Sequence, residues 1–327
     1  MKRRDFMALV GAGVLLQPTV ARPQQSSRKR IGVLFALPEA NPQAKARLAT
    51  FREELQKLGW SDITIDARYV AANDAETHLR YAKELVSLQP DLILAQNTDA
   101  TAAPLQHTRT IPIVFTIVAD PIGSGYVESF RRPGGNITGF VPSEPTMGGK
   151  WLELLKEIAP NVERVLVPFN GAERVVEYFL QSLRATAAIQ NVDARANYVR
   201  DLTELEAVIA AHALTPQGGV VFFPDAYFTG HRAEVTSLLG RYRLPTIYPY
   251  RFFAESGGLF SYGSDLLDNF RRAALYADRI LKGASVSELP VQAPEKFELV
   301  INLNTAKSLG LSVPQSLLGR ADDVIER

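Results

Sequence analysis

The alternation of short apolar runs with amphipathic stretches constrains the fold of this chain more than any other feature of its sequence. Ile31–Leu37 is short, uncharged and rich in aliphatic residues, which is typical of a strand buried on both faces. Asn41–Leu58 then carries apolar residues at helical spacing and ends before Gly59, a residue typical of helix C-caps. The alternation continues to Ile113–Thr116 in the order β-α-β-α-β-α-β, which predicts a parallel sheet with helices on both faces.

The same rhythm restarts after a turn and short strand at Arg132–Phe140. Strand-like runs such as Val162–Pro168 and Gly219–Pro224 alternate with helical patterns, and a long amphipathic helix is expected over Asp265–Lys282. No linker rich in Gly, Pro or Ser separates the two units, so we expect two α/β lobes in close contact, each a doubly wound parallel sheet. Such lobes hinge over a cleft, and ligands of open α/β sheets bind beyond the carboxyl ends of the strands.

Residues 1–25 have the pattern of a signal peptide. Lys2-Arg3-Arg4 is a positive start, Phe6–Leu16 is apolar, and Thr19-Val20-Ala21 resembles a cleavage site. The apolar stretch is too short for a bilayer span, which needs about 20 residues. Arg3-Arg4 favours a twin-arginine signal, with an ordinary Sec signal as the alternative. We therefore expect a soluble protein exported to the periplasm.

Composition excludes several classes of function. The net charge is +1 over 327 residues, and no basic face is visible that could bind nucleic acid. The chain has no cysteine, which excludes disulfides, thiolate nucleophiles and a lipid anchor on an N-terminal Cys. Its 4 histidines are scattered without metal-ligand spacing, so no metal is expected.

The motifs of common nucleotide enzymes and hydrolases are also absent from the sequence. The first apolar run ends at Ala36-Leu37-Pro38-Glu39, where a dinucleotide-binding enzyme needs Gly-x-Gly-x-x-Gly. Neither a phosphate-binding Gly-x4-Gly-Lys-Ser/Thr sequence nor a Gly-x-Ser-x-Gly nucleophile turn occurs. We expect no cofactor and a binding protein, not an enzyme.

Candidate ligand-binding residues lie where strands end and loops begin. They are Leu37, Asn97, Thr98, Thr116, Asp120, Asn170, Asp225, Tyr248 and Arg251. For most of them, the alternative is an ordinary turn or helix-cap role.

Asp225 follows a long buried strand, where a carboxylate is costly unless it is paired. A ligand ammonium is its favoured partner, and an N-cap role is the alternative. Asn97 and Thr98 would then bind a carboxylate, and Tyr248 with Tyr250 an apolar side chain. In this hypothesis the ligand docks on the N-terminal lobe and the C-terminal lobe closes over it.

Several long segments resemble the ABC-type substrate-binding proteins of the tryptophan/tyrosine-binding kind. The segments are Ile31–Leu34, Glu84–Ala95, Ile111–Phe140, Leu244–Gly263 and Ala277–Glu326. The resemblance implies the type I periplasmic-binding-protein fold, with a three-strand hinge crossed near Val141, Tyr262 and Leu289. The expected N-terminal lobe is then 28–141 plus 263–288, and the C-terminal lobe is 142–262 plus 289–327.

The resemblance also implies the partners of the protein. They would be a small-molecule ligand, amino-acid-like, aromatic or carboxylate-bearing, and the permease and ATPase subunits of an ABC transporter in the inner membrane. A monomer is expected. The alternative function is a periplasmic ligand sensor that docks on a membrane receptor or sensor kinase. Departures from relatives at Leu37-Pro38-Glu39 and at Asn97-Thr98 leave the ligand open.

Overall fold

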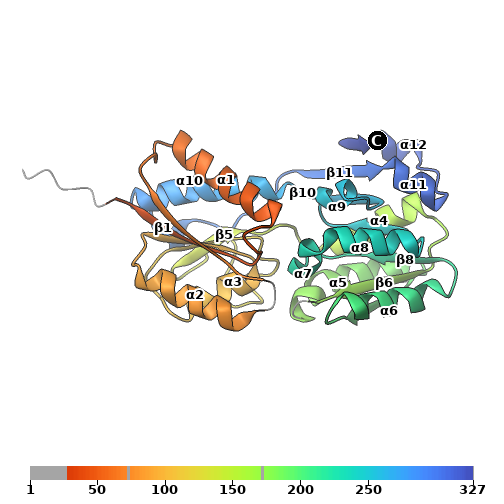
Figure 1. Cartoon of the computed structure of the whole chain (residues 1–327), viewed down its shortest axis with the longest axis horizontal. Helices are drawn as coiled ribbons and strands as arrows, with labels where there is room; N and C mark the ends of the chain where they lie inside the picture. Colours follow the sequence, from red (N-terminus) through yellow and green to blue (C-terminus); the bar gives the residue numbers. More distant parts are fainter. Residues whose placement is uncertain (1–27, 72–73, 171–172, 327) are drawn as a thin grey trace, which may run out of the picture.

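The computed structural model describes residues 28–71, 74–170 and 173–326, so the predicted signal peptide lies outside the described residues. The described chain forms two α/β lobes side by side, joined by extended segments between them (Figure 1). No helix in this part of the chain is long and apolar enough to cross a membrane.

The N-lobe is built on a five-stranded sheet in the order β2-β1-β3-β4-β5, and every strand pair in it is parallel. Its strands are β1 (Arg30–Phe35), β2 (Thr64–Tyr69), β3 (Leu92–Gln96), β4 (Ile113–Thr116) and β5 (Ile137–Phe140). Its helices are α1 (Pro42–Lys57), α2 (Ala75–Ser87), α3 (Thr98–Leu105), α10 (Leu266–Leu281) and the 3-10 turn η1 (Val286–Glu288). Helices α1 and α10 pack together over one core, and α2 and α3 pack over another (Figure 1).

The C-lobe is built on a seven-stranded sheet in the order β12-β11-β10-β9-β8-β6-β7. Its strands are β6 (Arg164–Phe169), β7 (Asp193–Tyr198), β8 (Gly218–Val221), β9 (Thr246–Tyr248), β10 (Phe260–Ser264), β11 (Phe297–Asn302) and β12 (Asp323–Ile325). Its helices are α4 (Met147–Ile158), α5 (Glu173–Ile189), α6 (Leu202–Ala213), α7 (Ala226–Gly230), α8 (Arg232–Arg241), α9 (Arg251–Glu255), α11 (Leu303–Leu309) and α12 (Gln315–Leu318). All pairs are parallel except β10 with β11, which is antiparallel. The mixed α/β fold with parallel sheets confirms the predicted class.

The two lobes exchange the chain at three places in the described structure, between β5 and α4, between β10 and α10, and between η1 and β11. These segments touch one another. The Ser264 hydroxyl donates a hydrogen bond of 2.6 Å to the carbonyl of Pro142. The main chain of Gln292 pairs in parallel with Phe140, and its carbonyl accepts from the Val141 N–H at 3.0 Å. Three crossings of this kind lie close together between the lobes, which is the arrangement expected of a hinge.

Candidate functional site: a cleft between the lobes

A cleft that is partly open to solvent lies between the lobes and is lined by both of them. The N-lobe lines it with Leu37, Arg47, Gln96, Asn97, Thr98, Asp99 and Ile117. The C-lobe lines it with Val175, Val176, Pro224, Asp225, Ala226, Tyr227, Thr229 and Tyr250. Ala119, Pro142 and Leu266, next to the hinge, complete the lining. The walls are mostly apolar with a few charged and polar groups, which is the composition of small-molecule sites.

The N-lobe wall is built from the ends of β3 and β4, and its backbone is strained there. Asn97 follows β3 with φ of 81°, and Ile117 follows β4 with φ of 60°. A β-branched residue in the left-handed region is a clear outlier, and such strain costs about 1–3 kcal/mol and concentrates at functional sites. The Asn97 N–H donates to the carbonyl of Thr116 at 2.9 Å, which holds the two strand ends together at the cleft.

Helix α3 starts at the cleft wall. The side chain of Asn97 caps it by accepting from the Ala100 N–H at 3.0 Å, and Thr98 and Asp99 in its first turn line the cleft. The positive end of the helix dipole therefore faces the cleft, where it favours an anionic group. Asn97 and Thr98, which the sequence assigned to a ligand carboxylate, lie in this wall together with Leu37.

Asp225 lies in the opposite wall and also has a structural role. One carboxylate oxygen caps α7 by accepting from the N–H groups of Tyr227 at 2.8 Å and Phe228 at 3.3 Å. The other oxygen accepts from the Asn170 N–H at 2.9 Å. The N-cap alternative considered for Asp225 is thus present in the structure, and the same carboxylate lines the cleft, so its binding of an ammonium stays a prediction.

Arg47 is a cleft residue that the sequence reasoning missed. It lies on α1, its side chain is only 2% exposed, and its Nε has no acceptor among the described residues. Burial, together with the nearby Arg232 cation, lowers the pKa of Arg47 to about 10, while Tyr250 acts in the opposite direction. The sequence signal that could have revealed Arg47 is its position on the predicted helix. Arg47 follows Ala44 by three residues and precedes Phe51 by four, which places a charge on the buried face of the helix.

Two tyrosines give the C-lobe wall its aromatic character. Tyr227 and Tyr250 both line the cleft, and the ring of Tyr250 lies 5.3 Å from that of Phe252. The Tyr250 hydroxyl is buried and has no hydrogen-bond partner among the described residues. Burial raises its pKa well above the ordinary value, so the hydroxyl is protonated and able to donate.

The other predicted site residues lie outside the cleft lining. Tyr248 is 1% exposed and stacks between Phe222 and Phe253, at centroid distances of 5.4 and 4.9 Å. Because β9 ends at Tyr248, the alternation expected to place Tyr248 and Tyr250 on one face does not extend to Tyr250.

Thr116, Asp120 and Asn170 are held at strand ends and turns. Thr116 is fully buried at the end of β4. Asp120 accepts from the Gly123 N–H at 2.8 Å within a turn. The Asn170 amide donates to the carbonyls of Val199 at 2.8 Å and Arg200 at 3.0 Å.

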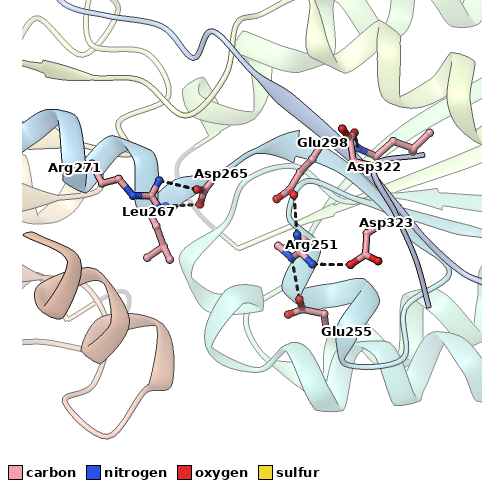
Figure 2. Close-up of polar contacts among 9 residues, drawn as sticks. Arg251, Glu255, Asp265, Leu267, Arg271, Glu298, Asp322 and Asp323 are labelled. Atoms are coloured by element: carbon pink, nitrogen blue, oxygen red, sulfur yellow. Dashed lines mark hydrogen bonds and ion pairs between the residues drawn. The ribbon is translucent and has the colours of Figure 1, made fainter. Parts of the chain in front are cut away.

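Arg251, the first residue of α9, is the centre of an ion-pair network (Figure 2). Its guanidinium contacts the carboxylates of Glu255, Glu298 and Asp323, each at 2.8 Å. Arg251 therefore joins α9 to β11 and β12, and it does not line the cleft. Near it, Asp265 caps α10 through the Leu267 N–H and pairs with Arg271 at 2.9 Å (Figure 2).

The geometry gives no arrangement for metal binding in the part of the chain that is described. No group of three His, Asp or Glu side chains there is placed to hold a metal ion.

Two α/β lobes, a triple crossing between them and a cleft lined from both sides are the features of the type I periplasmic-binding-protein fold. The sequence profile for ABC transporter substrate binding proteins matches residues 34–325. The chain therefore belongs to the ABC transporter substrate-binding protein family, which confirms the resemblance seen in its sequence.

Known proteins of this type are similar over nearly the whole chain. A tyrosine-binding protein of Clostridioides difficile (strain R20291) is 28% identical over 95% of this chain and 94% of its own length. The structure of an ABC domain from Streptococcus pneumoniae in complex with L-Trp matches with a TM-score of 0.84 at 24% identity, over 91% of this chain and 100% of that one. The ligand-free, open structure of a substrate-binding protein from Clostridium difficile matches with a TM-score of 0.68 at 25% identity, over the same shares of the two chains.

Proposed function

We propose that this protein is the exported receptor of an ABC uptake system and that it captures an aromatic amino acid between its lobes. The observation that carries the proposal is the cleft itself, because groups from both lobes line it and the hinge lies at its base. A ligand held there contacts both lobes at once, so its binding free energy favours the closed arrangement. The closed receptor then delivers the solute to a membrane permease driven by an ATPase.

The chemistry of the lining supports an aromatic amino acid as the ligand. Tyr227 and Tyr250 offer rings for an apolar body, and Val175, Val176 and Ile117 fill the rest of the walls. Charged groups lie in both walls, where they are available to the ammonium and carboxylate of the ligand. Two relatives point in the same direction, since one is a tyrosine-binding protein and another was crystallised with L-Trp.

The comparison of TM-scores supports closure by hinge motion. Identity and coverage are nearly equal for the two solved relatives, yet the score is 0.84 for the L-Trp complex and 0.68 for the open, ligand-free structure. A difference of this kind is expected where similar lobes are oriented differently.

Export of the protein is supported by the start of the chain. Residues 1–25 have a signal-peptide pattern with Arg3-Arg4, which favours the twin-arginine route and a periplasmic location. Its relatives are substrate-binding proteins, which supports a receptor that performs no catalysis. We propose that it acts as a monomer.

Calorimetric titration of the purified mature protein tests the proposed ligand. The panel is L-tyrosine, L-tryptophan and L-phenylalanine, with L-leucine and ribose for comparison. We expect aromatic amino acids to bind, and we expect Tyr227→Ala to weaken binding about 10-fold, because a ring contact and its buried area contribute about 1–2 kcal/mol.

Tyr198→Ala is the matched control, since Tyr198 is 56% exposed and lies outside the cleft lining. Binding of ribose alone would contradict the proposed ligand class. Aromatic binding that Tyr227→Ala leaves unchanged would show that the ligand does not lie against this wall. Tight binding without any uptake defect in a deletion strain would favour the sensor alternative.

A further inference from the structure

Arg47 presents an unpaired positive charge inside the cleft. Its side chain is 2% exposed, its Nε has no acceptor among the described residues, and no described ion pair includes it. A buried guanidinium without a partner is strongly unfavourable, and natural proteins keep such groups paired. Its lowered pKa of about 10 still leaves Arg47 charged at neutral pH.

A second unsatisfied donor faces the same cavity from the other lobe. The Tyr250 hydroxyl is buried without a partner among the described residues, and it lines the cleft with Arg47. Tyr250 is close enough to both charges for Arg47 to lower its pKa and for Asp225 to raise it. A cation of the N-lobe and a carboxylate of the C-lobe thus lie near one phenol.

We propose that Arg47 binds the carboxylate of the ligand, with the Tyr250 hydroxyl as a second donor from the opposite lobe. This inference rests on the proposed function and makes it more specific. A carboxylate accepts from a planar guanidinium at two points and has lone pairs left for a phenol, so a single group satisfies both orphan donors. The helix dipole of α3, whose first turn lines the same cleft, favours the same negative charge.

The charges also set the direction in which the ligand lies. With its carboxylate at Arg47, an amino acid turns its ammonium toward Asp225 and its side chain toward the apolar walls. Arg47 comes from α1 and Tyr250 from the loop before α9, so the carboxylate joins the lobes directly. Arg232 of α8 lies near enough to add to the repulsion that Arg47 experiences. A ligand carboxylate relieves this repulsion, whereas an amide or an amine in its place does not.

The first test compares matched ligands by calorimetric titration. The probes are L-tyrosine, its amide, tyramine and 3-(4-hydroxyphenyl)propionate, with L-tryptophan and its amide as a second series. We expect the wild-type protein to bind each acid about 100-fold more tightly than its amide, because the amide leaves a buried charge unpaired. Tyramine, which has no carboxylate, is expected not to bind measurably.

The second test changes the receptor. Arg47→Met is expected to lower the affinity for L-tyrosine about 100-fold and to abolish the difference between acid and amide. Arg47→Lys keeps a point charge and should retain part of the preference for the acid over the amide. Tyr250→Phe should lower the affinity for L-tyrosine about 10-fold. Arg195→Met is the control, because Arg195 is an exposed arginine of β7 outside the cleft lining, and the affinity of this variant should equal that of the wild type.

Thermal unfolding without ligand separates a binding role from a structural one. Because Arg47 has no ion-pair partner among the described residues, Arg47→Met should leave the Tm unchanged or raise it, whereas loss of a structural ion pair would lower it. A clear fall in Tm would overturn the proposal. An affinity of Arg47→Met for L-tyrosine equal to that of the wild type would also overturn the proposal. The proposed function would still stand in that case.

If the wild-type protein binds no aromatic amino acid, the proposed ligand class fails, and the arylpropionate then decides the role of Arg47. Its binding to the wild type and not to Arg47→Met would support a carboxylate site. If the arylpropionate does not bind to the wild-type protein, the proposed carboxylate site at Arg47 is overturned.

Discussion

The close packing of α4 on α5 makes Gly148→Ala a sharp test of the C-lobe structure. A Cβ atom built on Gly148 lies 2.0 Å from the carbonyl oxygen of Phe179 and 2.7 Å from the Ser182 hydroxyl. The first neighbour is main chain and has no rotamer to escape into, so the two helices must move apart. Overpacking of this kind costs about 1–3 kcal/mol, here toward the upper limit, and the helix propensity of Ala returns about 1 kcal/mol. We therefore expect a loss of about 2 kcal/mol, which lowers the Tm by roughly 4–8 °C.

Gly240→Ala provides the matched control for this substitution. Gly240 lies on α8, and a Cβ built there has no neighbour within 4 Å. The same change should stabilise the protein by about 0.5–1 kcal/mol through helix propensity alone. Urea unfolding followed by circular dichroism measures both variants. Equal effects of the two substitutions would refute the argument, because they would show that α4 and α5 are not in close contact at Gly148.

Two further predictions concern acid stability and the hinge. Burial lowers the pKa of His78 and of His212 below the ordinary value of 6.5, so the unfolded chain binds protons first as the pH falls, and stability is lost below about pH 6.5. The fall in Tm between about pH 7.5 and about pH 5.5 should be smaller in His78→Gln than in the wild type. In His107→Gln, whose histidine is exposed, it should equal that of the wild type. An equal fall in the wild type and both variants would contradict this reasoning. Ser264→Ala leaves the buried carbonyl of Pro142 without its 2.6 Å hydrogen bond and should lower the unfolding free energy by about 1–2 kcal/mol. In the same urea experiment, an effect no larger than that of Ser308→Ala, on an exposed helix surface, would contradict a structural role for this hinge contact.

The fold could be predicted from the sequence because its signals are local. Uncharged runs such as Ile31–Leu37 are strands that helices cover on both faces, and α1 and α10 show their amphipathic spacing directly. The short helices α7 and α9 were not predicted, because each has only one turn and gives no periodic pattern. The antiparallel pairing of β10 with β11 depends on how the chain returns from the N-lobe, which no local pattern encodes.

The candidate site was predicted less completely, since its residues come together only through tertiary packing. Leu37, Asn97, Thr98 and Asp225 were chosen as residues that follow strands, and the structure places all four in the cleft. The same rule also selected residues that follow strands but serve the scaffold. Arg251 is an example, because its three carboxylate partners lie 4, 47 and 72 residues away in sequence.

Arg47 shows where physical reasoning from sequence could have gone further. The buried face of α1 carries Ala44, Leu48, Phe51 and Leu55. A guanidinium on that apolar face is unfavourable unless it has an anionic partner. In a protein that works by closing two lobes, the partner can be the ligand. The cost of burying Arg47 is then part of the mechanism, because closure without an anion is opposed by the same charge that makes closure on a carboxylate favourable. Under the proposal for Arg47, specificity for the ligand and control of the hinge would follow from one side chain.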